Sequence, residues 1–251
     1  LKTLINSLLN SKLTFLSDIC FVKFINVSYF LILRLLLDFV SNHKLKMNIE
    51  VKNSIKPVDY RVSMRILEKR VNDVFLGKKK ELLWILEHNT VYTSGTSSNQ
   101  SDLINKKINV IKTNRGGKYT LHSPGQKVVY FVLNLNKRKK DIRGLVSKIE
   151  NCIIEILKFY KINSFADKKN IGVWVGDRKK PLKIAAIGIK VKKWIAYHGF
   201  SLNVSNDLSK YDAIIPCGIK DKKVTNLKKI GIINYNNIEK VIIDEFLNAF
   251  L

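Results

Sequence analysis

The chain has 251 residues, 46% of them hydrophobic, and its formal net charge at pH 7 is +25. This length and apolar content predict a globular protein with a substantial core, built as one large domain or two small ones. The three cysteines have no regular spacing, and C-x-x-C and H-E-x-x-H patterns are absent from the sequence. These features argue against a disulfide framework and a metal site, so we expect no metal, no cofactor and a reducing compartment.

Residues 1–46 differ in character from the remainder of the chain. They begin with Leu1, are apolar without a clear period, and their longest uncharged stretch runs from Phe24 to Leu33. That stretch is too short to span a bilayer, which needs about 20 residues, so we expect no membrane association. Three interpretations stay open: a mis-assigned start with the functional chain beginning at Met47, a targeting segment, and a helical hairpin packed on the domain.

From residue 47 onward, the hydrophobic pattern of the sequence predicts helices and strands in alternation. A helix is indicated by apolar residues at helical spacing, and Gly77 marks its end. These residues are Tyr60, Met64, Leu67, Val71, Val74 and Phe75. Two strands follow at residues 82–86 and 127–135, the second rich in Val, Tyr and Phe.

The second half of the chain continues the same pattern. Residues 145–160 form an amphipathic helical pattern with Cys152 on its apolar stripe, so we interpret Cys152 as a core residue. Strands are predicted at residues 171–175, 184–191 and 195–204, and a last helix with Asn237 as its cap. This order predicts an α/β protein of the α+β type, a mixed sheet with packed helices, and residues 47–251 as a single domain.

Cys217 lies between Pro216 and Gly218, on what reads as a tight turn. The thiolate is the reactive form of cysteine, and an unperturbed thiol has a pKa of about 8.5. A nearby ammonium group would raise the thiolate fraction. The alternative is a small buried hydrophobe, which is what most free cysteines are.

Lys183 opens the apolar run Ile184 to Gly188, at the edge of a predicted strand. A lysine at such an edge can be partly desolvated and can act as an acid or base. The alternative, in a chain so rich in lysine, is one more surface residue.

A polar, turn-rich segment runs from Arg115 to Gln126 before a predicted strand. Its paired glycines allow the backbone to approach a ligand closely. It is neither a G-x-x-x-x-G-K-S/T phosphate loop nor a G-x-G-x-x-G loop. His122 in this segment and His198 further on are candidates for substrate contact or for hydrogen-bonded structural histidines.

The ordered set of these motifs resembles the lipoyl(octanoyl) transferase family, in the superfamily of biotin and lipoate protein ligases. The resemblance covers roughly residues 50–235 and rests on six pieces. They are Glu87-His88 with Val91-Tyr-Thr-Ser-Gly95, Arg115-Gly-Gly-x-x-Thr-x-His122-x-Pro-Gly-Gln126, Gly172-Val-Trp-Val175, Lys183-Ile-Ala-Ala-Ile-Gly188, His198-Gly-Phe-Ser-Leu-Asn203 and Pro216-Cys-Gly-Ile219.

The resemblance implies roles for individual residues. Cys217 matches the cysteine that carries the acyl thioester, and Lys183 matches the lysine that lowers the pKa of that thiol. The residues that match substrate-binding positions are Arg115, Gly116, Gly117, Lys118, Tyr119, Thr120, Leu121, His122, Ala186, Ile187, Gly188, Gly199, Phe200 and Ser201. Ser123 departs from the family's pattern, which has glycine there; if that position needs a positive φ, Ser123 is strained.

The family resemblance also implies the reaction and the partners. The donor is octanoyl-acyl carrier protein, and the acceptors are lipoyl domains of 2-oxoacid dehydrogenase complexes and the glycine cleavage H protein. We expect a cytoplasmic monomer, or an organellar protein if residues 1–46 are a transit segment. The open alternatives are an ATP-dependent lipoate–protein ligase and a non-catalytic relative that binds acyl carrier protein.

The excess of lysine has two interpretations, a compositional bias or a basic face for an acidic partner. We see no helix-turn-helix, zinc spacing or aromatic-rich basic strand, so nucleic acid is not predicted. Acyl carrier proteins are acidic, which fits a basic face. The candidate docking runs are residues 137–140, 178–183, 190–193 and 220–229.

Overall fold

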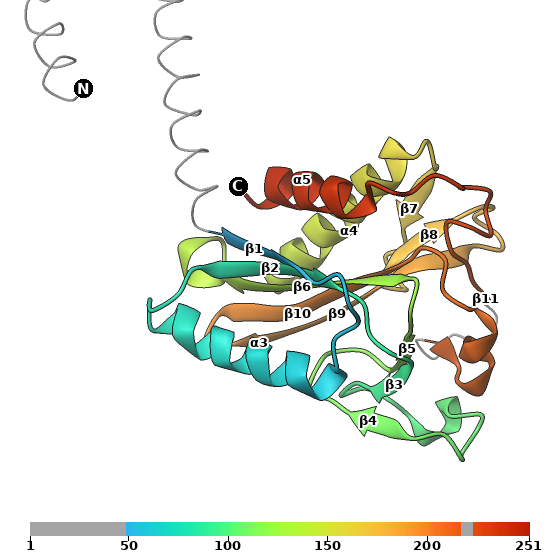
Figure 1. Ribbon diagram of the computed structural model, residues 1–251, viewed down its shortest axis with the longest axis horizontal. Coiled ribbons are helices and arrows are strands. Elements are labelled where there is room, and N and C mark those ends of the chain that lie inside the picture. Colours follow the sequence, from blue (N-terminus) through green and yellow to red (C-terminus); the bar gives the residue numbers. More distant parts are fainter. Residues whose placement is uncertain (1–48, 217–222) are drawn as a thin grey trace, which may run out of the picture. The chain divides into compact units, whose positions relative to one another are not determined.

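The computed structural model describes residues 49–216 and 223–251, which contain two β-sheets and three α-helices (Figure 1). The predictions for residues 1–46, for Cys217 and for residues 218–222 lie outside the described residues. The mixed sheet with packed helices that the sequence predicts is confirmed. Within the described residues, none of the helices combines the length and hydropathy that a membrane span requires.

The main sheet has eight strands, and most neighbouring strands in it are antiparallel. The exceptions are the parallel pairs β1–β2 and β9–β11. In spatial order the strands are β1 (Ile49–Asn53), β2 (Glu81–Leu86), β6 (Gln126–Asn134), β10 (Ile195–Asn203), β9 (Leu182–Lys192), β8 (Val173–Val175) and β7 (Ser164–Ala166), with β11 (Lys223–Val224) beside β9.

A smaller sheet of three strands contributes the loop that will matter for the site. Its order is β4 (Val110–Lys112), β3 (Val91–Ser94) and β5 (Tyr119–His122). Short 3-10 helices connect the elements: η1 (Gln100–Asp102), η2 (Leu135–Lys137) and η3 (Ser209–Ala213).

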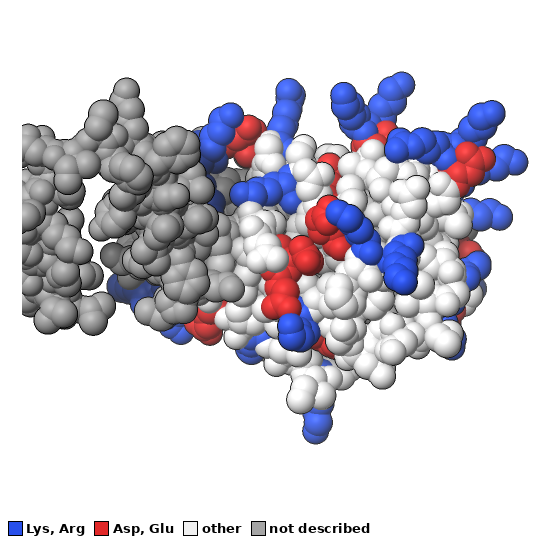
Figure 2. All heavy atoms as spheres, turned by 90° about the horizontal axis from the view of Figure 1, so that it is seen from above, with Lys and Arg blue, Asp and Glu red and all other residues white. Residues whose placement is uncertain are grey.

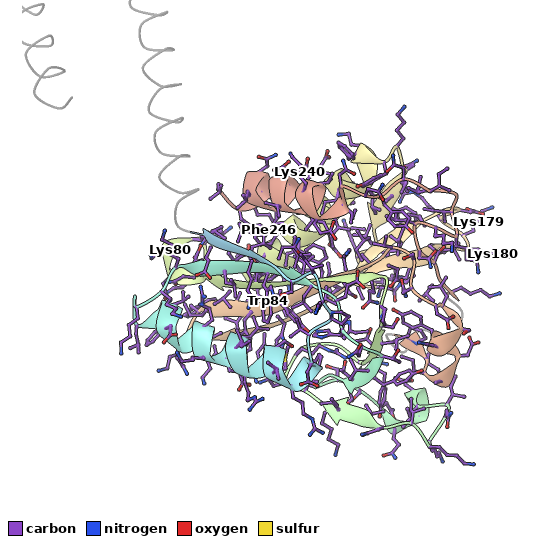
Figure 3. All side chains as sticks on the ribbon, in the orientation of Figure 1. Lys80, Trp84, Lys179, Lys180, Lys240 and Phe246 are labelled. Carbon is purple, nitrogen blue, oxygen red and sulfur yellow. The ribbon has the colours of Figure 1, made fainter. Side chains whose placement is uncertain are left out.

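The helices cover both faces of the main sheet. The helices α4 (Ile142–Phe159) and α5 (Ile238–Phe250) pack on one face, and α3 (Tyr60–Phe75) packs on the other. Figure 3 shows Phe246 pointing from α5 toward the sheet and Lys240 pointing away from it. Trp84 of β2 lies on the α3 side, in the same apolar cluster as Leu67.

Two aspartates begin the long helices. The Asp59 side chain accepts a hydrogen bond from the Val62 N–H at 2.9 Å, and Asp141 accepts one from Gly144 at 2.9 Å. Each satisfies a backbone donor that the first helical turn leaves without a partner, which stabilises a helix by about 1 kcal/mol. At Gly77, just beyond α3, φ is +68°, a conformation that suits glycine.

The predicted helices and central strands are confirmed, with two differences. The strand expected at residues 171–175 begins only at Val173, because Gly172 has a φ of +127°. Asn237 precedes α5, but its side chain makes no capping hydrogen bond. Asn237 is therefore the N-cap residue of α5 by position, as predicted, but its Oδ1 accepts a hydrogen bond from the Tyr160 hydroxyl at 2.9 Å and not from the helix.

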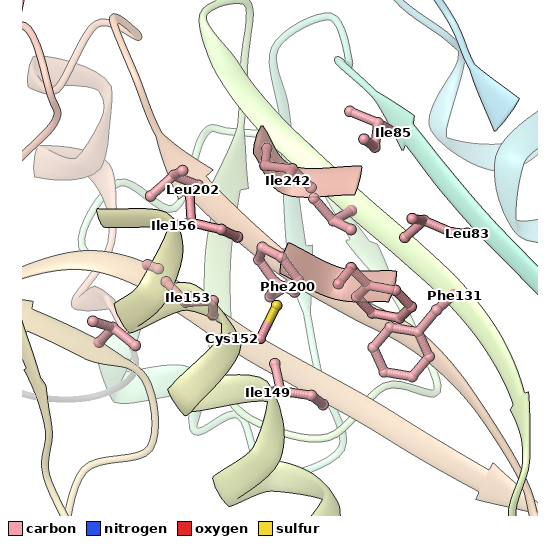
Figure 4. Packing of buried hydrophobic residues seen from close by; sticks show 14 of the residues in the cluster. Leu83, Ile85, Phe131, Ile149, Cys152, Ile153, Ile156, Phe200, Leu202 and Ile242 are labelled. Carbon is pink, nitrogen blue, oxygen red and sulfur yellow. The ribbon is translucent and has the colours of Figure 1, made fainter. Parts of the chain in front are cut away.

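Cys152 lies in the apolar core between α4 and the sheet, as its place on the helical stripe predicts (Figure 4). Its neighbours there include Ile149, Ile153 and Phe200. Burial raises the pKa of the Cys152 thiol to about 12, so this thiol stays protonated and unreactive at neutral pH.

Phe246 of α5 is a central residue of the core. Its ring is fully buried, and its centroid lies 5.8 Å from that of the Phe131 ring and 4.6 Å from that of the Phe250 ring. A Phe246→Ala variant should lose about 3–5 kcal/mol of unfolding free energy in urea, because it loses burial and leaves a cavity. The control is Phe159→Ala, at a side chain that is 57% exposed. Equal losses in both variants would contradict this view of the core.

Candidate active site

A cleft of about 420 Å³ lies along β9 and β10 and extends past the edge of β9. Among the described residues, β9 pairs with no further strand on its β8 side after Ala185, and the cleft is bordered there by loops and by the start of α4. Its lining includes Lys183 and all of the predicted substrate-binding residues except Leu121. The tertiary structure therefore brings segments from Arg115 to Ser201 together around one cavity.

The loop from Arg115 to Gly117 lies directly against the backbone of β9. The Gly116 N–H donates to the Ile189 carbonyl at 3.0 Å. A Cβ atom at Gly188 would lie 3.2 Å from the Gly116 oxygen and 3.3 Å from the Arg115 side chain. The glycines at these positions therefore allow loop and strand to pack together.

The Arg115 side chain fixes this loop through buried hydrogen bonds. Its guanidinium is buried and donates to the Thr93 carbonyl at 3.0 Å, to the Thr93 hydroxyl at 2.8 Å and to the Gly116 carbonyl at 3.0 Å. These contacts join the loop to β3 of the small sheet. Leu121 is the one predicted residue placed elsewhere: it is fully buried beside Tyr211 and Ile214 and does not line the cleft.

His122 belongs to a chain of buried hydrogen bonds that links several elements near the cleft. The amide nitrogen of Gln126 donates to the Leu121 carbonyl and to the Asn203 side-chain oxygen at 2.8 Å. The Gln126 oxygen therefore faces His122 and accepts from its Nδ1–H at 2.6 Å. Asn203 in turn donates to the Thr225 carbonyl at 2.9 Å. This chain joins β5 to the residue that follows β11.

Burial keeps the cleft's histidines neutral. It lowers the pKa of His122 to about 3, with a further contribution from His88, and lowers the pKa of His198 to about 3, with one from Arg115. His88 donates from Nδ1 to the Val58 carbonyl at 2.6 Å, so its Nε2 accepts from the Tyr130 hydroxyl at 2.8 Å. Both His122 and His88 are therefore neutral and hydrogen-bonded within the protein, and His122 also lines the cleft.

His198 has an unusual backbone, with a φ of +69°. Its Nε2 hydrogen bonds to the Asn114 side-chain oxygen at 2.7 Å, and the Asn114 amide donates to Glu68 of α3 at 3.1 Å. The ring also stacks on its neighbour Tyr197. The positive φ accounts for two consecutive side chains of β10 both facing α3 where a regular strand would alternate.

Ser123 is buried, and it is not among the residues with positive φ. The strain that its replacement of glycine would have implied is therefore absent. The turn at this point uses Gly125, whose φ is +82° and where a Cβ atom would lie 2.7 Å from the Asn206 nitrogen.

Lys183 is buried at the inner end of the cleft, with 5% of its surface exposed. Its Nζ donates to the Ile171 carbonyl at 2.9 Å and lies 4.8 Å from the centre of the Trp174 ring. The pairing of β8 with β9 shifts register between Val173 and Trp174, which gives β9 one extra residue beside Lys183. Lys183 is thus buried at the wall of the cleft, so the prediction that it belongs to an exposed docking run of residues 178–183 is wrong.

The described residues that flank Cys217 lie next to Lys183. Pro216 lines a small pocket together with Lys183, Thr120 and Ser201. Val224, after the undescribed residues 217–222, pairs with Lys183 in the sheet. Among the described residues, no group of three side chains is placed to hold a metal ion.

The family model of the lipoyl protein ligase A/B catalytic domain matches residues 59–247 of this chain. The octanoyltransferase of Ehrlichia chaffeensis is 42% identical over 205 residues, which cover 80% of this chain and 96% of that relative. The octanoyltransferase of Anaplasma phagocytophilum is 42% identical over 207 residues, covering 81% of this chain and 100% of that relative.

Two solved structures show the same fold at low sequence identity. One is a bipartite lipoate protein ligase from Thermoplasma acidophilum, with a TM-score of 0.63 and 14% identity, covering 80% of this chain and 82% of that chain. The other is a lipoate-protein ligase A bound with ATP, with a TM-score of 0.60 and 13% identity, covering 80% of this chain and 85% of that chain.

The neutral state of His198 predicts a pH dependence of stability. Its pKa is about 3 in the folded protein, against about 6.5 in the unfolded chain. As pH falls below about 6.5 the unfolded chain binds a proton that the folded protein does not bind, so the folded state loses stability, by about 2 kcal/mol per such histidine between pH 7 and 5. In a His198→Asn variant, which tolerates a positive φ, the difference in unfolding free energy between pH 7 and 5 should shrink by about that amount. Urea titrations at both pH values measure it, and an unchanged difference would contradict the neutral, buried histidine.

Proposed function

We propose that this chain, which belongs to the lipoyl protein ligase A/B catalytic-domain family, transfers an octanoyl group to a lysine of lipoyl-domain proteins. The observation that carries the proposal is an identity of 42% to an octanoyltransferase across 96% of that relative's length. The acyl donor, in this proposal, is octanoyl-acyl carrier protein, and the acceptors are lipoyl domains of 2-oxoacid dehydrogenase complexes and the glycine cleavage H protein. The enzyme works as a cytoplasmic monomer.

The first step is transfer of the acyl group to Cys217. Its thiolate attacks the thioester carbonyl of the donor, a new carbon–sulfur bond forms, and the thiolate of the carrier leaves. Lys183 protonates the leaving thiolate and becomes neutral. One thioester replaces another, so this step needs no ATP. Support comes from the buried Lys183 and from Pro216, which lines one small pocket together with Lys183 and directly precedes Cys217 in the sequence.

The second step releases the product. The ε-amine of the acceptor lysine attacks the acyl-enzyme, the amide bond forms, and the Cys217 thiolate leaves. The neutral Lys183 takes the proton from the attacking amine and returns to its ammonium form, which favours the thiolate for the next cycle. The cycle is balanced in protons, and the stability of the amide drives it forward.

The mouth of the cleft suits an acidic carrier protein. We call Ile142, Arg143, Lys168, Lys169 and Ile171 the rim. Ile142, Lys169 and Ile171 line the cleft, and the two isoleucines are 46% and 53% exposed. Among the described residues, none of the three rim cations forms an ion pair, whereas Lys118 across the cleft is held by Asp102 at 3.3 Å.

The other candidate docking runs differ in how their charges are used. Lys179 and Lys180 project outward beyond β8 (Figure 3). Arg138 and Lys139 are paired with Glu81 and Asp141, which neutralises part of the run at 137–140. Figure 2 shows the face that carries α4 and α5, where Lys and Arg side chains gather along the margin and acidic residues are fewer. The rim combines a lysine of the cleft lining with two neighbouring cations, and Lys118, a partly exposed lysine of the same lining, is already paired with Asp102.

Intact mass spectrometry tests the proposed chemistry. The wild-type chain mixed with octanoyl-acyl carrier protein, without ATP, should gain one octanoyl group that hydroxylamine removes. Cys217→Ser should gain none, and Lys183→Met should gain it at least about 10-fold more slowly, a change of about 1.4 kcal/mol in the barrier. An adduct that forms only with octanoate and ATP would contradict the proposal and indicate a ligase. The absence of an adduct under both conditions would indicate a non-catalytic relative.

Charge reversal at the rim tests the docking proposal. A Lys168→Glu/Lys169→Glu variant should lower kcat/KM for the acyl carrier and weaken its dependence on salt, because exposed charges are screened over about 10 Å at 0.1 M salt. The matched control is Arg65→Glu/Lys69→Glu on the exposed face of α3, which changes the net charge equally on the opposite side of the sheet. Equal losses of kcat/KM in the two variants would mean that the rim lysines have no specific docking role and reflect compositional bias.

A further inference from the structure

The ammonium group of Lys183 is held by one peptide group of the loop between β7 and β8. Its Nζ donates to the carbonyl of Ile171 at 2.9 Å. The N–H of the same peptide group belongs to Gly172, and it donates to the Oε1 atom of Glu150 at 3.1 Å. In a planar trans peptide the carbonyl and the N–H point in opposite directions. The ammonium, the peptide group and the carboxylate therefore form a continuous line.

Glu150 is otherwise difficult to explain. It lies on α4 with 8% of its surface exposed, on the same buried stripe as Leu145, Ile149 and Ile153. Among the described residues it forms no ion pair, and the Gly172 N–H is its one hydrogen-bond partner. Burying a carboxylate costs several kcal/mol unless charged or hydrogen-bonding partners compensate. An apolar residue at this position would serve packing better.

Gly172 is shaped for this contact. Its φ is +127°, and a Cβ atom there would lie 2.6 Å from the Cε atom of Lys183 and 2.6 Å from the Ala185 oxygen. The loop is fixed on its far side, because the Trp174 indole N–H donates to the Asn170 carbonyl at 3.0 Å and the Asn170 amide donates to Asp167 at 2.7 Å. A side chain at residue 172 would separate the peptide from the lysine.

The electrostatics of the line favour a charged lysine. A peptide group has a dipole of about 3.5 D, and hydrogen bonds in series polarise one another. The carboxylate at the N–H end increases the negative character of the Ile171 carbonyl oxygen that faces Lys183. Glu150 thus acts on the ammonium through the peptide group without direct contact.

We propose that Glu150 is a positioning residue that orients and stabilises the Lys183 ammonium through the Ile171–Gly172 peptide group. The proposal rests on the function proposed above for Lys183. In this proposal the negative charge of Glu150, and not only its shape, supports the reactivity of Lys183 and Cys217.

A double-mutant cycle tests the assignment. Glu150→Gln keeps the size and the accepting oxygen but removes the charge. It should slow octanoyl transfer to Cys217 by about 10-fold in kcat, with KM within about 2-fold and the thermal unfolding midpoint nearly unchanged. In a Lys183→Met background the same change should have no further effect, because both act on one group. Additive effects in the cycle, or a Glu150→Gln variant with wild-type kcat, would overturn the proposal.

Two further variants separate position from stability. Glu155 lies on the same helix and forms an exposed ion pair with Lys158. A Glu155→Gln variant should therefore leave kcat unchanged. Glu150→Asp keeps the charge on a side chain one methylene shorter and should retain more activity than Glu150→Gln. An aspartate variant less active than the glutamine variant would assign the role to shape and overturn the proposal.

One readout does not depend on the transfer reaction. The ¹³Cε NMR signal of Lys183, identified by its loss in Lys183→Met, should shift in Glu150→Gln and stay in place in Glu155→Gln. A shift in a chain that forms no acyl adduct would support the Glu150–Lys183 coupling while rejecting the proposed function. The absence of a shift in a chain that does form the adduct would reject the coupling alone.

Discussion

The burial of one lysine is the constraint on which the candidate site depends. Lys183 has 5% of its surface exposed, and an ammonium removed from water needs compensation of several kcal/mol. The structure supplies it with the Ile171 carbonyl and the face of Trp174. Ile171 directly precedes β8 and Trp174 lies within it, so the pairing of β8 with β9 and the conformation at Gly172 together place both groups around the ammonium.

The cleft depends on a second constraint, the close approach of backbone to backbone. The loop after β4 lies on β9 at Gly116, and Gly188 leaves room for it. Arg115 is a buried clamp to β3 and Gly116, so its charge organises the wall of the cleft. A preformed apolar cavity with a few fixed polar groups is the usual form of a site for a small acyl chain.

The polar groups of the site are mostly neutral and already hydrogen-bonded. His122, Gln126 and Asn203 form a line that ends at the Thr225 carbonyl, and the Thr225 N–H donates to the Lys183 carbonyl at 2.9 Å. The cleft and the strand that carries Lys183 are therefore one connected structure. In the proposed reaction this rigidity holds Lys183 in place, while the acyl group arrives and leaves on mobile carrier domains.

The sequence by itself determined the helices, the central strands, the apolar place of Cys152 and the order of motifs, because periodicity and short motifs are local properties. It did not reveal the small sheet, the inward position of Leu121 or the flipped backbone at His198, because these depend on contacts between distant segments. The line from Lys183 to Glu150 shows the limit best: Ile171 lies 12 residues before Lys183, and Glu150 lies 22 residues before Gly172. Only the packing of α4 on the sheet brings that carboxylate to the peptide group, and no local pattern in the sequence contains this information.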